Sequence, residues 1–156
     1  MAAGRPSDPT DHAYHEAGHA VIAWVLGWSV LHVSIAPPQP VATVWPPAGL
    51  SGWSLRRGDT ASILAGFVAE VISWPQRGIP VWPEQGIAWV HGHPEYTQAV
   101  TDFRNAGATD PEAEVRAIGA QAYRDLQQHW VRVETVAALL CQYQTLSPQQ
   151  LAQLFP

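Results

Sequence analysis

The chain has 156 residues, of which 47% are hydrophobic and 13% charged, and its eight Arg, no Lys and 13 acidic residues give a net charge of −5. The hydrophobic fraction excludes a disordered chain, because enough apolar surface is present to offset the entropy lost on folding. Nucleic acids and anionic membranes bind through clustered cations, so the acidic balance makes both poor partners. We expect a single domain over residues 1–156, with residues 1–8 flexible.

Membrane and secretion signals are weak in this sequence. The longest apolar stretch, residues 20–28, is too short for a helix that crosses a bilayer, which takes about 20 residues. The first residues lack the basic-then-apolar order of a secretory signal. Cys141 is the single cysteine, so it forms no internal disulfide, and its apolar neighbours predict a buried side chain. Together these features predict a cytoplasmic protein.

The first helix is the best-marked element. Asp8 is expected to cap it, Pro9 suits its first turn and Gly27 can end it. Residues 28–35 then alternate in polarity and are rich in β-branched side chains, which predicts a strand. Residues 41–45 predict a second short strand, which ends at two prolines.

The rest of the chain is predicted to be mainly helical. A second helix is expected over residues 59–73, followed by a long irregular loop over residues 74–93, which are rich in Pro, Gly and Trp. The core face of that helix is expected to contain Ile63, Leu64, Phe67 and Val71. Further helices are expected to start at Pro94, Asp110-Pro111 and Ser147-Pro148, with a break within residues 128–133. The predicted fold class is mostly α (α+β), with a small two- or three-stranded sheet after the first helix.

The residues His15-Glu16-Ala17-Gly18-His19 form an HExxH motif inside the first predicted helix. Side chains four residues apart lie one above the other on a helix, so both imidazoles can reach one metal ion. A catalytic zinc site has three protein ligands and a water whose pKa falls to about 7. Glu16 could take the proton from that water as it attacks a carbonyl. The motif predicts a zinc-dependent peptide hydrolase and leaves the third ligand open.

Chance is the competing explanation of the motif. A chain of this composition contains HExxH by chance in roughly one to two cases per hundred, and chance placement on a capped helix is rarer. In that case the two histidines and the glutamate would be unrelated surface or core residues.

The similarity extends beyond the motif itself. AYHEAGHAV at residues 13–21 resembles the signature of the FtsH-type ATP-dependent zinc proteases. Residues 31–35 resemble the strand that follows the motif in that family, residues 63–70 resemble its AGRAAE helix, and residues 146–155 resemble its closing helix. The resemblance implies a helical, zincin-like peptidase domain with His15 and His19 as zinc ligands.

In that family the third zinc ligand is an Asp in a D-L-x-x-A motif near the start of a later helix. Two segments fit this motif in part. Glu95 begins one at a predicted helix start but replaces the Asp by Glu, which is an acceptable zinc ligand. Asp102 keeps the Asp but lies about two turns further along the helix. We favour Glu95, then Asp102, then His93.

Other polar residues are candidates for supporting roles. Glu70 matches a family glutamate on the second helix and is expected to orient or support the site. His91 and His93 lie in the segment that should border the site, where they could support it or contact substrate; the alternative is that they are exposed loop histidines. Val41–Trp45 is a candidate edge strand along which a peptide substrate could add, with nearby Trp side chains as subsite walls.

The leading functional hypothesis is a zinc metallopeptidase that acts on polypeptides. The sequence contains no GxxxxGK[ST] phosphate-binding loop, so ATP-independent cleavage is expected. The alternative is a catalytically inactive, zinc-stabilised protein-interaction module of the same fold. The Trp-rich segment would also suit a homo-oligomer.

Overall fold

The computed structural model describes residues 8–79 and 83–156. The flexibility expected for residues 1–8 therefore falls outside the described residues, except for Asp8. The Asp8 carboxylate accepts hydrogen bonds from the backbone N–H groups of Thr10 and Asp11, at 2.8 and 2.9 Å. It caps helix α1 (Pro9–Val25), and Gly27 follows the helix with a φ of 79°. Both predicted ends of the helix are confirmed.

Strands β1 (Ser29–Ser34) and β2 (Val41–Trp45) form the predicted sheet. They are antiparallel, with Ser29 opposite Trp45, and Ser34 opposite Val41. In the described part of the chain the sheet has two strands. A single bridge from Ser34 to Thr145 covers the outer edge of β1. No described strand pairs with the outer edge of β2.

Helix α2 (Gly52–Gln76) is longer than predicted at both ends. It starts at Gly52, seven residues before the predicted start at residue 59. Within this added segment, Gly58 packs directly against the ring of Trp28. It also continues through Trp74, whose buried indole N–H donates to Asp11 on α1 at 3.2 Å. Tertiary contacts therefore override the tendency of Pro75 to end a helix, and Pro75 is accommodated in the last turn.

The predicted core face of α2 is only partly correct. Leu64 and Phe67 are buried and Val71 is partly buried, but the Ile63 side chain is 40% exposed. The face of α2 that packs on α1 carries small residues, including Ala65, because the two helices lie close together. Because that face is directed toward α1, Ile63 lies on a side of α2 that is open to solvent.

The long irregular loop predicted over residues 74–93 is wrong. Its first residues belong to α2, and helix α3 (Pro83–His91) occupies most of the remainder. Proline is favourable in the first turn of a helix, since the missing N–H would have no intrahelical partner. Trp89 on α3 packs edge-on against Phe67 and against Trp74 of α2. These aromatic contacts hold the segment against the body of the protein.

Four more helices complete the chain: α4 (Pro94–Asn105), α5 (Pro111–Gln128), α6 (Trp130–Tyr143) and α7 (Pro148–Leu154). The predicted break within residues 128–133 is confirmed, because His129 separates α5 from α6. Among the described helices, none combines the length and apolar character that a membrane crossing requires.

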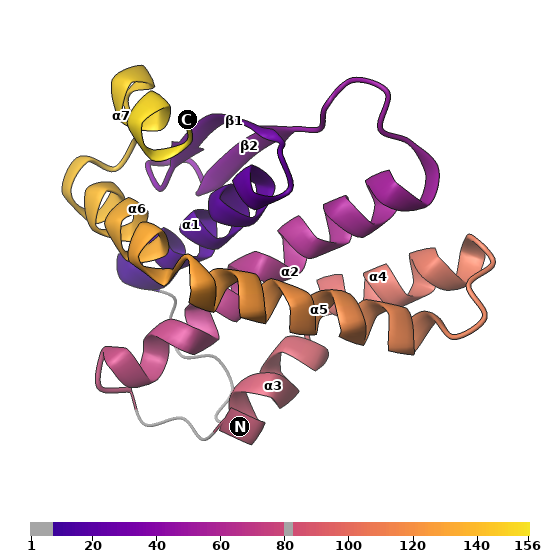
Figure 1. Cartoon of the computed structure of the whole chain (residues 1–156). Coiled ribbons are helices and arrows are strands. Elements are labelled where there is room, and N and C mark those ends of the chain that lie inside the picture. The colour runs from indigo at the N-terminus through magenta and orange to yellow at the C-terminus, as the bar shows by residue number, and fades with distance from the viewer. Residues whose placement is uncertain (1–7, 80–82) are drawn as a thin grey trace.

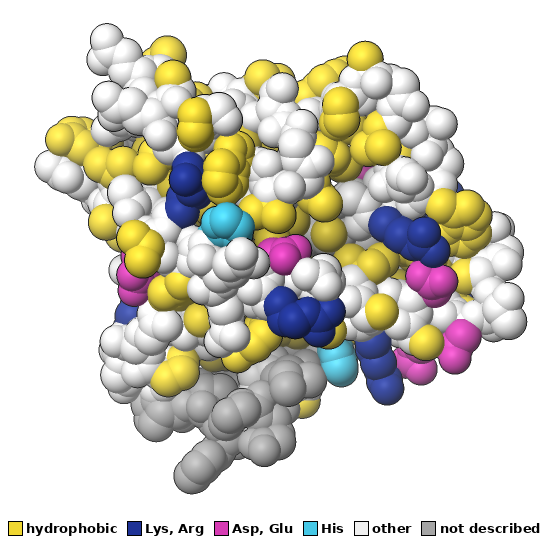
Figure 2. Space-filling model, in the orientation of Figure 1, with side chains coloured by type: hydrophobic (Ala, Val, Ile, Leu, Met, Phe, Trp, Pro, Cys, Tyr) yellow, Lys and Arg dark blue, Asp and Glu magenta, His cyan; other side chains and the backbone are white. Residues whose placement is uncertain are grey.

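Helix α1 lies between α2 and α6, with the sheet across its far end (Figure 1). One buried cluster joins α1, β1, α2 and α6, and a second joins α2, α4 and α5. The fold is therefore mostly α-helical with a small sheet after the first helix, as predicted. Cys141 is exposed, which corrects its predicted burial. On the face drawn in Figure 2, basic side chains are scattered, and some of them lie beside acidic ones.

Candidate metal centre

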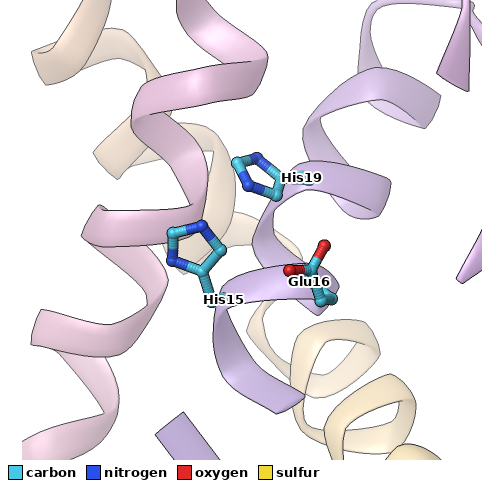
Figure 3. A group of neighbouring side chains, drawn as sticks. All are labelled: His15, Glu16 and His19. Atoms are coloured by element: carbon cyan, nitrogen blue, oxygen red, sulfur yellow. The ribbon is translucent and has the colours of Figure 1, made fainter. Parts of the chain in front are cut away.

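The HExxH residues of α1 come together as the spacing predicts. One ligand atom each from His15, Glu16 and His19 lie within 4.8 Å of one another. Figure 3 shows both imidazole rings on the side of α1 that faces α2, one turn apart, with the Glu16 carboxylate beside them. This His-Glu-His group has the composition and spacing of a metal-binding cluster.

Hydrogen bonds fix which nitrogen of each imidazole is free. Nδ1 of His15 lies 2.6 Å from Oε1 of Glu70, and Nδ1 of His19 lies 2.5 Å from the backbone oxygen of Ser62. A backbone carbonyl can only accept, so His19 carries its proton on Nδ1. When Glu70 is ionised, its carboxylate favours the same tautomer for His15. Both Nε2 atoms are then left as electron-pair donors, which is the form that binds a metal.

Gly66 on α2 leaves open the space beside these Nε2 atoms. A Cβ at this position would lie 2.8 Å from Nε2 of His15 and 2.8 Å from Nε2 of His19. Any larger residue would therefore occupy the volume in which the two lone pairs converge. The donor atoms and this free space together fit a divalent metal ion.

A second glycine brings the two helices close enough for this arrangement. A Cβ on Gly18 of α1 would lie 2.4 Å from the backbone oxygen of Ala65 and 2.8 Å from the Cβ of Ala69. No L side chain can be that close without moving a helix. The close approach puts the backbone oxygen of Ser62 and the carboxylate of Glu70 within reach of the imidazoles on α1.

Burial sets the protonation states in this cluster. Desolvation lowers the pKa of His15 to about 4, and the charge of Glu95 opposes this effect. Desolvation also lowers the pKa of His19 to about 4. Both histidines are thus neutral at pH 7, as a metal ligand must be.

The carboxylate of Glu16 is also buried, with only 5% of the residue exposed. Desolvation raises its pKa to about 7, and the charges of Glu70 and Glu95 add to the increase. A carboxyl with a pKa near the working pH is suited to general acid–base chemistry.

The two carboxylates that are candidates for the third metal ligand border the same cavity. Glu95 at the start of α4 and Asp102 further along that helix both line a cavity of about 730 Å³, together with His19. The charge of Glu95 perturbs His15, Glu16 and His19, whereas that of Asp102 is not among the causes of their pKa shifts. The Asp102 carboxylate accepts a hydrogen bond from Gln98 at 2.8 Å. Among the described residues, neither carboxylate belongs to the 4.8 Å cluster.

His93 and His91 lie in different surroundings. His93 caps α4 by accepting a hydrogen bond from the Glu95 N–H at 3.2 Å, and its ring centroid lies 3.9 Å from that of Phe67. Phe67 in turn contacts the ring of His15, so His93 borders the cluster through this aromatic contact. His91 is exposed, packs at a tilt against the ring of Tyr96, and lines a separate cavity.

Three residues of this site have no role in the sequence-based hypothesis: Ser62, Gly66 and Phe67. The signal for Gly66 was present, because Ala65, Gly66 and Ala69 are small residues on the side of α2 that packs on α1. Ser62 acts through its backbone oxygen, which leaves no trace in the identity of its side chain. Such a partner is found only from the structure.

Comparison with models of known protein families finds no match for this chain. Comparison with curated proteins finds no relative either. The interpretation of the site therefore rests on its own geometry and chemistry.

Proposed function

We propose that this protein is a zinc metallopeptidase, of the type that the FtsH-like signature at residues 13–21 suggests. The observation that carries the proposal is the pair of buried imidazoles whose Nδ1 atoms are engaged, by Glu70 and by the Ser62 carbonyl, while their Nε2 atoms converge on the space beside Gly66. A buried base, Glu16, lies beside them. A purely structural zinc site is usually closed by four protein ligands and has no need of such a base.

Each residue has a defined role in this proposal. His15 and His19 hold the metal through Nε2, and Glu95 completes the ligand set. A bound zinc ion would act as a Lewis acid and lower the pKa of a coordinated water. Glu16 takes a proton from the attacking water and delivers it to the leaving amine, a role that its pKa of about 7 favours.

The surroundings of the cluster favour a polypeptide substrate. The cavity that contains His19, Glu95 and Asp102 is also lined by Ala42 and Val44 of β2. A substrate in extended conformation could hydrogen-bond to the outer edge of β2, which no described strand covers. Its backbone would then pass along the cavity toward the HExxH residues.

The test compares wild type with Glu16→Gln, which keeps the size of the side chain and removes the base. We expect both proteins to bind zinc and only the wild type to cleave casein, with a loss of at least about 100-fold in the variant. Glu134→Gln, an exposed Glu on α6, is the matched control and should retain full activity. Added ATP should not change the rate.

The same experiment decides between the enzyme and the interaction module. Zinc binding by the wild type without cleavage of casein or of flexible peptides would favour the inactive, zinc-stabilised module. Equal cleavage by wild type and Glu16→Gln would remove Glu16 from the mechanism and contradict the proposal.

A further inference from the structure

A second cavity lies on a different face of α2 from the metal centre. It has a volume of about 650 Å³, between α2 and α5, with His91 and Tyr96 at one end. Its apolar wall comes from Leu64, Val68, Val71, Ile72, Val90 and Ala120. The volume falls within the range of about 300–1,000 Å³ that is typical of small-molecule sites. None of the HExxH residues, Glu70 or Glu95 lines it.

The hydroxyl of Tyr96 is the unusual group in this cavity. Tyr96 is only 5% exposed, and no described residue accepts a hydrogen bond from its buried hydroxyl. The guanidinium of Arg116 acts on it both by its charge and as a hydrogen-bond donor to the phenolic oxygen. An arginine has donors and no acceptor, so it cannot take the phenolic proton. A buried donor without an acceptor is costly, which makes an external acceptor favourable here.

Four other polar side chains of the cavity already have hydrogen-bond partners: Gln76, Tyr123, Arg124 and Gln127. Gln76 accepts a hydrogen bond from the Trp130 indole at 2.7 Å, and Gln127 donates to the Tyr123 hydroxyl at 2.9 Å. Arg124 donates to Gln121 at 2.7 Å. Arg116 takes part in no ion pair among the described residues. Glu112, one turn before it on α5, is the nearby acid that acts on this end of the cavity.

We propose that this cavity binds a small amphipathic carboxylate, with an aliphatic chain along the apolar wall and its carboxylate between Tyr96 and Arg116. One carboxylate oxygen accepts a hydrogen bond from the Tyr96 hydroxyl, and the other pairs with the Arg116 guanidinium. Hydrogen bonds to an ionised acceptor are among the stronger ones in proteins, and a planar guanidinium suits a carboxylate. This inference does not depend on the proposed peptidase function, because the two sites share no residue.

The test uses calorimetric titration of the full chain with decanoate, kept below the concentration at which it forms micelles. Acetate, which has only the head group, and decanol, which has only the chain, are the matched probes. We expect saturable binding of one decanoate per chain, about tenfold or more tighter than either probe. Absence of saturable decanoate binding, or equal affinity for decanol, overturns the proposal.

Variants then locate the site. Tyr96→Phe removes only the hydroxyl, so the free protein should be as stable as wild type or more so, while decanoate binding weakens about tenfold or more. Arg116→Gln should weaken binding similarly, and Ala120→Phe, which fills the cavity from its exposed rim, should abolish it. Arg104→Gln, an exposed arginine of α4 outside the cavity, should leave binding unchanged. Unchanged binding in both Tyr96→Phe and Arg116→Gln overturns the proposal even if decanoate binds.

Discussion

His15 and Glu70 are 55 residues apart in sequence, yet Nδ1 of the first lies 2.6 Å from Oε1 of the second. The contact joins α1 to α2 and directs Nε2 of His15 toward the proposed metal position. A carboxylate in this position fixes both the ring and its tautomer. Glu70 thus orients His15 in the same way as the Ser62 carbonyl orients His19.

Zinc affinity should depend on pH through Glu70. Desolvation raises the pKa of Glu70 to about 8, and the nearby charge of Asp11 adds to the increase. When zinc binds Nε2 of His15, the proton of that ring is on Nδ1 and Glu70 must accept a hydrogen bond from it. Below pH 8 the Glu70 carboxyl has to lose its own proton before it can do so. The histidines, with pKa values of about 4, do not compete for protons above about pH 5. Affinity should therefore rise roughly tenfold per pH unit from pH 6 to 8 and then level off.

Glu70→Gln is the matched variant for this pH dependence. A glutamine carbonyl accepts a hydrogen bond from the His15 N–H without losing a proton, so zinc affinity should rise less steeply with pH in the variant than in wild type between pH 6 and 8, with the titration of Glu16 as the remaining contribution. Competition titration with a fluorescent zinc chelator at several pH values measures both proteins. The same slope in wild type and Glu70→Gln would show that another group releases the proton.

Gly66→Ala should impair metal binding. The added Cβ would lie 2.7 Å from Cε1 of His19 and 2.8 Å from both Nε2 atoms, so both rings must move against the hydrogen bonds that hold their Nδ1 atoms. Overpacking of this kind costs about 1–3 kcal/mol. We expect zinc affinity to fall at least about tenfold, measured by the same competition titration.

Gly119→Ala on α5 is the control for Gly66→Ala. Its Cβ would meet only Cδ1 of Leu64 at 3.6 Å, an ordinary contact. The helical preference of Ala should then stabilise the protein by up to about 1 kcal/mol with no effect on zinc. Equal zinc affinity in the two glycine variants would mean that Gly66 does not border the metal position.

The elements that local sequence specifies were predicted, and those that tertiary contacts specify were not. The Asp8 cap, Pro9 and the HExxH spacing act within α1, so the helix and its polar face could be read directly. The N-terminal extension of α2 depends on the contact between Gly58 and Trp28, and its last turn on the bond between Trp74 and Asp11. Neither pair is adjacent in sequence, so the pattern of α2 alone gave the wrong limits.

The identity of the third ligand is a tertiary question of the same kind. Glu95 and Asp102 are both on α4, and the choice between them depends on how far each lies from the histidines of α1. Glu95→Ala should lower zinc affinity about 100-fold or more, because it would remove the proposed third ligand, whereas Asp102→Ala should change it less than threefold. Zinc titration of the two variants measures this difference. A large loss in Asp102→Ala with little change in Glu95→Ala would reverse the assignment.

Asp11 is expected to be the main polar support between α1 and the end of α2. Its carboxylate accepts hydrogen bonds from the Trp74 indole and the Arg77 guanidinium, and the residue is 4% exposed. Asp11→Ala leaves the cation of Arg77 without its buried partner and should lower the free energy of unfolding by about 3 kcal/mol. Denaturant titration measures this loss. Asp125→Ala, which removes a partly exposed partner of Gln121, should change stability by no more than about 0.5 kcal/mol; a similar loss in both variants would contradict the assignment.

Return of zinc to chelator-treated protein is the most direct test of the proposed catalytic centre. The rate of casein cleavage is measured as zinc is added in steps to the metal-free chain. The proposal predicts no cleavage without metal, a rate that rises in proportion to bound zinc, and saturation at one ion per chain. Cleavage that survives complete removal of metal, or one bound zinc per chain with no cleavage, would contradict a catalytic zinc centre at His15, Glu16 and His19.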